Sequence, residues 1–148
     1  MIPLTLAVEL KEAGLVWQTK TYDFFAIPDH SMDERVFVLA DMVAFTELVQ
    51  GWPAVAFHGA AEWALDYIYS HELVWLPTEE QLREALVARL RGDDSAAGLT
   101  LGTRAAGGYR CTIERQGETL SFDAPAAGEA YARALLHLLR QRDRANGV

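Results

Sequence analysis

The apolar residues of this chain follow a helical period in three segments and a strand period in most of the others. In 4–13, in 78–92 and from about Ala126 onward, an apolar residue recurs every three or four positions, which predicts amphipathic helices. Short runs rich in aromatic and β-branched residues occupy much of 17–57, and strict alternation returns between 99 and 122. The chain is therefore expected to combine antiparallel strands with helices.

The first and last predicted helices differ in their end signals. Gly14 followed by Leu15 is typical of a glycine that ends a helix and of its apolar follower. Asp123 is the expected cap of the last helix. The expected buried stripes are Leu6, Leu10 and Ala13 in the first helix and Tyr131, Ala134, Leu135 and Leu138 in the last.

The helix after residue 77 has the clearest local signals. Thr78 followed by Gln81 predicts a capping box. The helix dipole also favours the two glutamates in the first turn, because negative charge is stabilised near a helix N-terminus. Glu79 and Arg83 have the spacing of an ion pair, and Gly92 is expected to end the helix. The expected buried stripe is Leu82, Ala85, Leu86 and Leu90.

The segment before this helix predicts a strand meander. The expected strands are Trp17–Ile27, Val36–Val43, Phe45–Val49, Ala54–Phe57 and Leu73–Leu76, with turns at Pro28–Ser31 and Gln50–Pro53. Ala60–Ser70 fits both periods, and we favour a short helix there over a strand.

Register can be argued for the three strands that follow. A two-residue turn at Gln116-Gly117 pairs Ile113 with Leu120 and Cys111 with Phe122, so that one face of the hairpin is wholly apolar. An odd loop such as 105–107 brings Leu99 and Leu101 onto the same apolar face. The whole pattern predicts an α+β fold, a single domain over 1–148, with antiparallel sheet and three to four helices mainly on one face.

The charge of the chain is confined to its first half. Met1–Leu76 has three basic residues and eleven carboxylates, a net of −8, whereas Pro77–Val148 has ten of each. Twelve of the fifteen aromatic residues, including all four tryptophans, lie in the same acidic half. If the chain has a recognition surface, we expect it in this half, because aromatic faces framed by carboxylates attract cations. We favour the alternative, a core of aromatic residues beneath a solvated acidic face.

Composition excludes several classes of function. A net charge of −8 repels phosphate backbones, so we expect no binding to nucleic acid. The apolar start is interrupted by Pro3 and Glu9, and no apolar run reaches the length of a membrane span, so we expect neither secretion nor membrane binding. A lone Cys111 is expected to be a buried, inert thiol of a cytoplasmic protein. Phosphate-binding loops and the nucleophile elbow of serine hydrolases are missing from the sequence, and we expect no cofactor.

The densest cluster of candidate ligands is Asp29, His30, Asp33 and Glu34. Carboxylates and an imidazole this close are the groups that bind a divalent metal or act as a general base. Their spacing matches no known metal motif, and the same residues are typical of a solvated hairpin loop. We favour the loop and keep a ligand site at these residues, with Trp63 and the carboxylates Glu62 or Asp66, as the alternative.

Five blocks of this chain resemble a group of small uncharacterised bacterial proteins, some of which carry a pilus-assembly label. The blocks are Glu9–Leu15, Phe25–Asp29, Phe37–Met42, Glu62–Asp66 and Trp75–Leu82, so the resemblance spans about the first ninety residues. It identifies relatives without assigning an activity or a functional residue.

Two functions remain open from the sequence. The first is a non-catalytic interaction or regulatory module, whose acidic aromatic half binds a basic protein or peptide or a second copy of the chain. The second is a small enzyme or a protein that binds a small ligand or metal near Asp29, His30 and Asp33.

Overall fold

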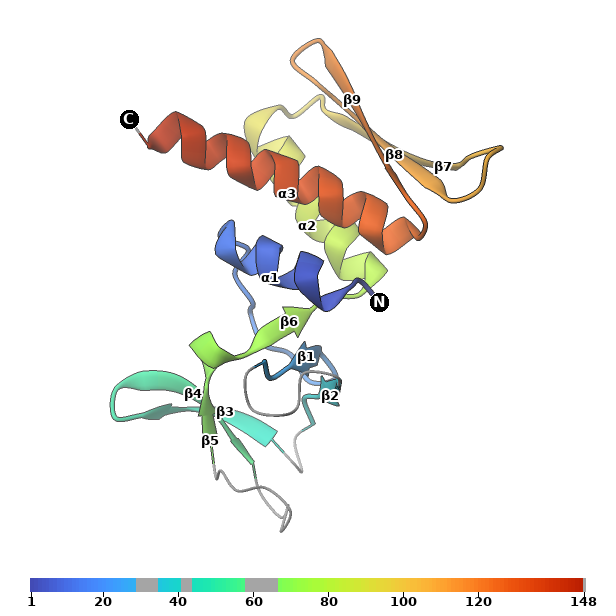
Figure 1. Cartoon of the computed structure of the whole chain (residues 1–148). Coiled ribbons are helices and arrows are strands. Elements are labelled where there is room, and N and C mark those ends of the chain that lie inside the picture. The colour runs from blue at the N-terminus through green and yellow to red at the C-terminus, as the bar shows by residue number, and fades with distance from the viewer. Residues whose placement is uncertain (29–34, 41–43, 58–66, 148) are drawn as a thin grey trace. The chain divides into compact units, whose positions relative to one another are not determined.

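The structure is a computed structural model that describes residues 1–28, 35–40, 44–57 and 67–147. These residues form three α-helices, one short 3-10 helix and nine strands in three antiparallel sheets, which is an α+β fold (Figure 1). The chain divides into two compact units, each described by itself below. We call Met1–Leu15 with Pro77–Val148 the helical unit, and Val16–Leu76 the aromatic unit. That 1–148 is one domain stays a prediction.

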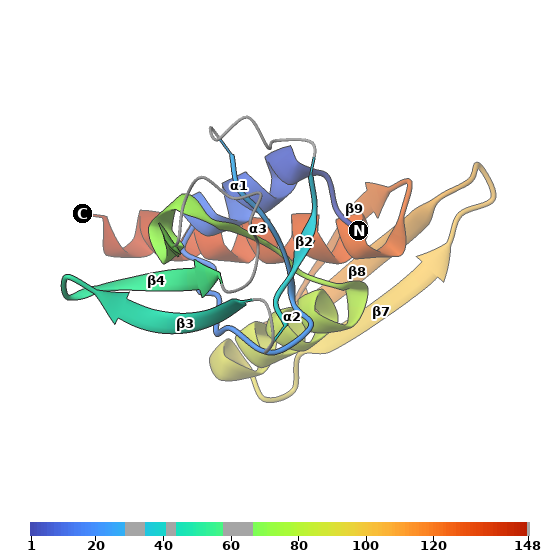
Figure 2. The same ribbon diagram turned by 90° about the horizontal axis from the view of Figure 1, so that it is seen from below.

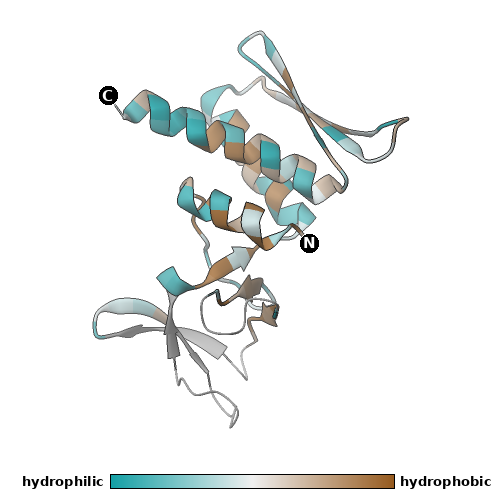
Figure 3. Cartoon of the chain, viewed as in Figure 1, coloured by the Kyte–Doolittle hydropathy of each residue, from teal (hydrophilic) through white to brown (hydrophobic). Residues whose placement is uncertain are grey.

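The helical unit contains all three α-helices and one sheet. Its elements are α1 (Leu4–Glu12), α2 (Glu79–Asp93), β7 (Gly98–Thr103), β8 (Tyr109–Arg115), β9 (Glu118–Ala124) and α3 (Ala127–Asn146). The three strands lie side by side in chain order (Figure 2). Figure 3 shows hydrophilic and hydrophobic positions alternating along α3, as expected of a helix with one buried face.

The end of α1 confirms the predicted glycine stop. Gly14 has φ +99°, a left-handed conformation that glycine adopts at little cost. Its N–H donates to Lys11 O at 3.0 Å, and the Leu15 N–H donates to Leu10 O at 2.9 Å. These two bonds form a Schellman motif, which satisfies carbonyl groups that a helix end leaves free.

The predicted capping box of α2 is confirmed. The Gln81 N–H donates to Thr78 Oγ1 at 3.2 Å, and the Thr78 N–H donates to Gln81 Oε1 at 2.9 Å. Two details differ from the prediction. Arg83 lies 3.6 Å from Glu80 rather than pairing with Glu79, and the helix continues to Asp93. The buried stripe consists of Leu82, Leu86 and Leu90, while Ala85 is half-buried.

The predicted register of β7, β8 and β9 is confirmed in full. Leu99 pairs with Ile113, and Leu101 pairs with Cys111. On the other side of β8, Cys111 pairs with Phe122 and Ile113 with Leu120, across a turn in which Gln116 and Gly117 both have positive φ. Cys111 and Ile113 are fully buried, and α3 covers this face with the predicted stripe of Tyr131, Ala134, Leu135 and Leu138.

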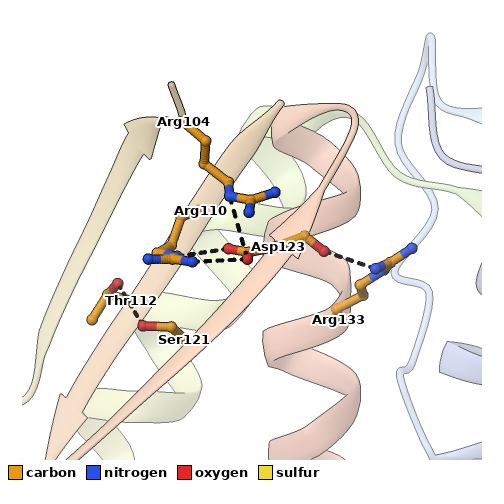
Figure 4. Close-up of polar contacts among 6 residues, drawn as sticks. All are labelled: Arg104, Arg110, Thr112, Ser121, Asp123 and Arg133. Carbon is orange, nitrogen blue, oxygen red and sulfur yellow. Dashed lines mark hydrogen bonds and ion pairs between the residues drawn. The ribbon is translucent and has the colours of Figure 1, made fainter. Parts of the chain in front are cut away.

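The predicted cap of α3 is wrong. The N-cap residue is Ala126, which provides no side-chain hydrogen bond. Asp123 lies in β9, which ends before Pro125, whereas α3 begins after it. The Asp123 carboxylate accepts hydrogen bonds from Arg110 at 2.7 and 2.9 Å (Figure 4). A cross-strand guanidinium therefore takes the carboxylate that the sequence assigned to the helix.

The aromatic unit consists of short strands. Its elements are β1 (Phe24–Ala26), β2 (Phe37–Val38), β3 (Ala44–Val49), β4 (Trp52–Phe57), β5 (Tyr67–Tyr69), the 3-10 helix Ser70–Glu72 and β6 (Val74–Leu76). They form two sheets, β2-β1-β6 and the meander β3-β4-β5. In Figure 3 the strands β1 and β6 are mostly hydrophobic.

Four predictions in this unit are corrected. The expected strand Trp17–Ile27 is a strand only at Phe24–Ala26, and in the described part of Val36–Val43 only Phe37–Val38 is a strand.

The turn and the short helix also differ from the prediction. Trp52 and Pro53 belong to β4, because Gln50 and Gly51 alone make the turn, with φ of 52° and 82°. Over 67–69 the predicted short helix is wrong, because Tyr67–Tyr69 pair with β4 as a strand. Residues 60–66, like the expected turn at 29–31, lie outside the described residues.

Candidate functional site

The residues that the sequence singled out as a ligand site remain untested. Asp29, His30, Asp33, Glu34 and Trp63 all lie outside the described residues, as do Glu62 and Asp66. A ligand or metal site at these positions stays a prediction. The described part of the same unit shows where its other aromatic side chains lie.

Two of the four tryptophans, Trp17 and Trp75, are half-buried, and Trp17 packs against the core of the aromatic unit. Trp17 stacks on Trp75, with ring centroids 6.5 Å apart and planes 6° from parallel. Trp17 also lies 5.8 Å from Phe25, which is fully buried and packs in turn against Phe37 at 5.6 Å. The core around Phe25 is completed by Ile27, Leu39 and Leu73. This part of the aromatic composition is structural.

Trp52 lies on the surface. Its exposed fraction is 63%, and it is the first residue of β4 after the Gln50-Gly51 turn. The strand pairs throughout with β3, so the backbone that presents this side chain is held by a ladder of hydrogen bonds. A large aromatic side chain on a paired hairpin is a pre-organised contact, because it has only two side-chain torsions to fix.

A buried carboxylate holds a second aromatic side chain outward. Asp23 is 4% exposed, and its Oδ2 accepts hydrogen bonds from Trp17 Nε1 at 2.8 Å and from the Lys20 N–H at 2.9 Å. The turn is tied to Leu39, whose N–H donates to Asp23 O at 2.8 Å. Between these contacts Tyr22 has φ +71° and is 74% exposed. Asp23 is thus occupied in positioning the turn.

Other apolar side chains are exposed near this turn. Val36 and Val38 are 47% and 42% exposed, while Phe37 between them packs inward against Phe25. Val38 immediately precedes Leu39, whose carbonyl accepts the Tyr22 N–H. The exposed apolar side chains of the described part of the aromatic unit are Val16, Tyr22, Val36, Val38 and Trp52.

The aromatic unit also carries almost all of the net charge. Residues 16–76 contain two basic residues, Lys20 and Arg35, and nine carboxylates, a net of −7. The helical unit has eleven basic residues and twelve carboxylates, a net of −1. The negative field is therefore centred on the unit that exposes Trp52 and Tyr22.

In the helical unit, the polar side chains around Asp123 already pair with one another. Asp123 lies 3.3 Å from Arg104 besides its two hydrogen bonds to Arg110, and the hydrogen bond from Arg110 holds the pKa of this carboxyl below its ordinary value (Figure 4). Arg133 donates to the Asp123 carbonyl at 2.7 Å. Arg104 and Arg110 border a shallow depression of about 570 Å³ over β7 and β8, and both already pair with Asp123.

Cys111 has the properties expected from the sequence. It is fully buried, and burial raises the pKa of its thiol to about 11. A thiol in this state is protonated at neutral pH, and only the thiolate is a good nucleophile. Its place is in the core of the sheet.

No group of three His, Cys, Asp or Glu side chains capable of holding a metal ion occurs among the residues that the structure describes. Across the same residues, no helix has the length and apolar character needed to cross a membrane. Comparison of the chain with protein-family models, curated proteins and solved structures finds no match. The resemblance noted in the sequence therefore stays an expectation.

Proposed function

We propose that this chain is a non-catalytic interaction module whose aromatic unit binds a basic protein or peptide. The observation that carries the proposal is Trp52, 63% exposed beside a hairpin turn, within a unit of net charge −7. Tyr22, presented by the turn that Asp23 holds, supplies a second exposed aromatic ring. The proposed ligand is rich in lysine and arginine.

The chemistry of such a surface combines two forces. Carboxylates raise the encounter rate of a cationic partner over a distance set by the salt concentration. Aromatic faces then contact individual ammonium or guanidinium groups, each contributing about 0.5–2 kcal/mol. Together these forces select basic partners and weaken as salt is added.

Self-association through the aromatic unit is disfavoured by the same charges. Two copies of the unit would bring together net charges of −7 each. A basic partner removes this repulsion, so it is the partner that we propose for this unit. We also infer a cytoplasmic location from the lone Cys111, which cell fractionation tests.

The test is a titration of the full chain with an oligolysine peptide of about ten residues at low and high salt. We expect Trp52→Ala to weaken binding at low salt by between about 2-fold and 30-fold, the range that one cation-π contact provides. This substitution leaves the net charge unchanged, so it separates the aromatic contribution from simple attraction.

Glu118→Gln is the matched control for charge. Glu118 is exposed in the helical unit, so its loss is expected to leave binding nearly unchanged. If Trp52→Ala bound the peptide as tightly as the unaltered chain, the proposal would be wrong, because only non-specific attraction would remain. Binding that persists undiminished at high salt would contradict it as well.

A further inference from the structure

The two outer strands of the sheet in the helical unit differ in how they are protected. Among the residues that the structure describes, β7 pairs only with β8, and all six of its residues pair in continuous register without a bulge. The strand reads Gly-Leu-Thr-Leu-Gly-Thr, with no charge and no proline. β9, the other outer strand, carries Glu118 and Asp123. Proteins usually protect a free strand edge with charge, proline or a bulge, and β7 has none of these.

Apolar surface remains open beside the same strand. Leu99 and Leu101 of β7 are only half-buried, whereas Cys111 and Ile113 opposite them on β8 are fully buried. A groove of about 240 Å³ lies along the inner side of β7. Its lining is Val87 and Leu90 of α2, Leu99 and Leu101 of β7, and Ala97 and Tyr131, together with Arg83 and Arg91 of α2.

The sequence of β7 is symmetric about Thr100. Gly98, Leu99, Thr100, Leu101 and Gly102 read the same in both directions. If two such strands pair antiparallel with Thr100 opposite its copy, each leucine faces a leucine of the other chain and each glycine a glycine. Directly opposed residues of antiparallel strands lie on the same face, so all four leucines fall on the helix-covered side.

The charges of α2 fit the same symmetry. Its first half carries Glu79, Glu80 and Glu84 against Arg83, and its second half carries Arg89 and Arg91 against Asp93. A two-fold axis through Thr100 runs the two α2 helices in opposite directions. The acidic half of each helix then lies toward the basic half of the other, which is a complementary arrangement.

We propose that two copies of this chain associate by antiparallel pairing of their β7 strands about Thr100, forming one continuous six-stranded sheet. The pairing satisfies the free backbone groups of β7 and covers Leu99 and Leu101. It uses the helical unit, of net charge −1, and so is independent of the binding proposed for the aromatic unit. The interface is small, so the dimer is expected to dissociate in the micromolar range, on the order of 10 µM.

A disulfide cross-link tests the register directly. In Thr100→Cys the two introduced thiols are opposed residues whose Cα atoms would lie about 4.5–5.5 Å apart, within the range that a disulfide spans. We expect oxidation to convert this variant to a covalent dimer, while the native Cys111 stays buried and unreacted. Thr119→Cys on β9, equally exposed on the other outer strand, is the matched control and is expected to stay monomeric under denaturing electrophoresis.

The non-covalent dimer is measured by sedimentation equilibrium of the full chain from about 1 to about 200 µM. Thr100→Lys places two like charges opposite each other and is expected to weaken the dimer severalfold, to about tenfold. Thr119→Lys is expected to leave it unchanged. Circular dichroism spectra of the two lysine variants that match the spectrum of the unaltered chain establish that both are folded.

A monomer throughout this concentration range, or a dimer that Thr100→Lys and Thr119→Lys weaken equally, would overturn the proposal. So would equal cross-linking of the two cysteine variants. Salt separates this proposal from the function proposed above. Added salt screens both the repulsion between two chains of net charge −8 and the attraction between the two α2 helices, so the dimer is expected to change little with salt, whereas oligolysine binding weakens. Trp52→Ala is expected to leave the dimer unaltered.

Discussion

The contacts within the helical unit differ from those within the aromatic unit in how far apart their residues lie in the sequence. In the helical unit, α1 ends in a Schellman motif, α2 begins at a capping box, and β8 turns into β9 through two residues. In the aromatic unit, β1 pairs with β2 on one side and with the distant β6 on the other, and the three strands of this sheet have two or three residues each. Short strands of this kind depend on the core that brings them together.

The difference extends to charge. The helical unit is nearly neutral, and most of its arginines contact carboxylates within the unit, as Arg140 does with Glu9 at 2.7 Å. The aromatic unit has nine carboxylates and two basic residues. One unit therefore balances its charge internally, while the other leaves an excess that a partner could neutralise. The comparison teaches that the unit with balanced charge and the unit proposed to bind a partner are different parts of the same chain.

Truncating the two cores is expected to have the largest effect. Phe25→Ala removes a fully buried ring from the aromatic unit and is expected to cost about 3–5 kcal/mol of unfolding free energy. Ile113→Ala in the helical unit is expected to cost about 2–5 kcal/mol. The measurement is urea unfolding followed by tryptophan fluorescence and by far-ultraviolet circular dichroism.

These two signals report on different units. All four tryptophans lie in 16–76, whereas all the described α-helices lie in the helical unit. If 1–148 is one domain, as the sequence predicts, both signals change at the same urea concentration in the unaltered chain and in each variant. Separate midpoints, with Phe25→Ala shifting only the fluorescence transition, would replace that prediction with two domains.

Alkaline pH is expected to destabilise the helical unit next most strongly. The pKa of the Cys111 thiol is about 11 in the fold against an ordinary value of 9.0, so unfolding releases a proton between these values. Stability is thus fully present below about pH 9 and falls as the pH rises toward 11. Tyr131, whose pKa burial also raises, adds to the fall. Cys111→Ala is expected to reduce the slope of midpoint against pH without abolishing it; an unchanged slope would show that the thiol is not the cause.

Removing the cap of α2 is expected to have a smaller effect. Thr78→Ala loses the side-chain acceptor of the Gln81 N–H and is expected to cost about 0.5–2 kcal/mol. Thr78→Ser keeps the hydroxyl and is the control. Thermal unfolding followed by circular dichroism measures both. Equal losses in the two variants would contradict a capping role.

The exposed contact between Asp123 and Arg110 is expected to contribute least. The hydrogen bond from Arg110 lowers the pKa of the Asp123 carboxyl, so its stabilisation is present above the ordinary carboxyl pKa and lost as the pH falls through the lowered value. Asp123→Asn is expected to lower the melting temperature slightly at pH 6 and not at pH 2. A difference that persists unchanged at pH 2 would assign the effect to something other than the charge.

Sequence reasoning succeeded where the signal was local. The dipeptide Gln-Gly, which occurs twice, shows the limit of this reasoning. Alternating residues flank Gln116-Gly117, and they identify it as a two-residue turn. Gln50-Gly51 makes the same kind of turn, with positive φ at both residues. The sequence predicts the second turn two residues too long, because Pro53 follows it, and it leaves open whether Trp52 is buried or exposed. The repeated dipeptide was the signal that could have found it.

Other features had no local signal. The left-handed conformation of Tyr22 depends on hydrogen bonds between its turn and Leu39, which is distant in sequence. Asp123 is near enough to α3 to cap it, yet Arg110 reaches it across the strands. Whether Asp29, His30, Asp33, Glu34 and Trp63 form a ligand site lies outside the described residues.

The sequence by itself determined the α+β class, the end of α1, the start of α2, the register of β7, β8 and β9, and the confinement of the net negative charge to the first half. Each of these depends on neighbours a few residues apart or on composition alone. The tertiary structure decided where the described tryptophans lie: Trp17 stacks on Trp75 and packs against the buried Phe25, while Trp52 is exposed. Burial is a property of what packs against a side chain, and for the aromatic unit those neighbours come from strands far apart in the chain.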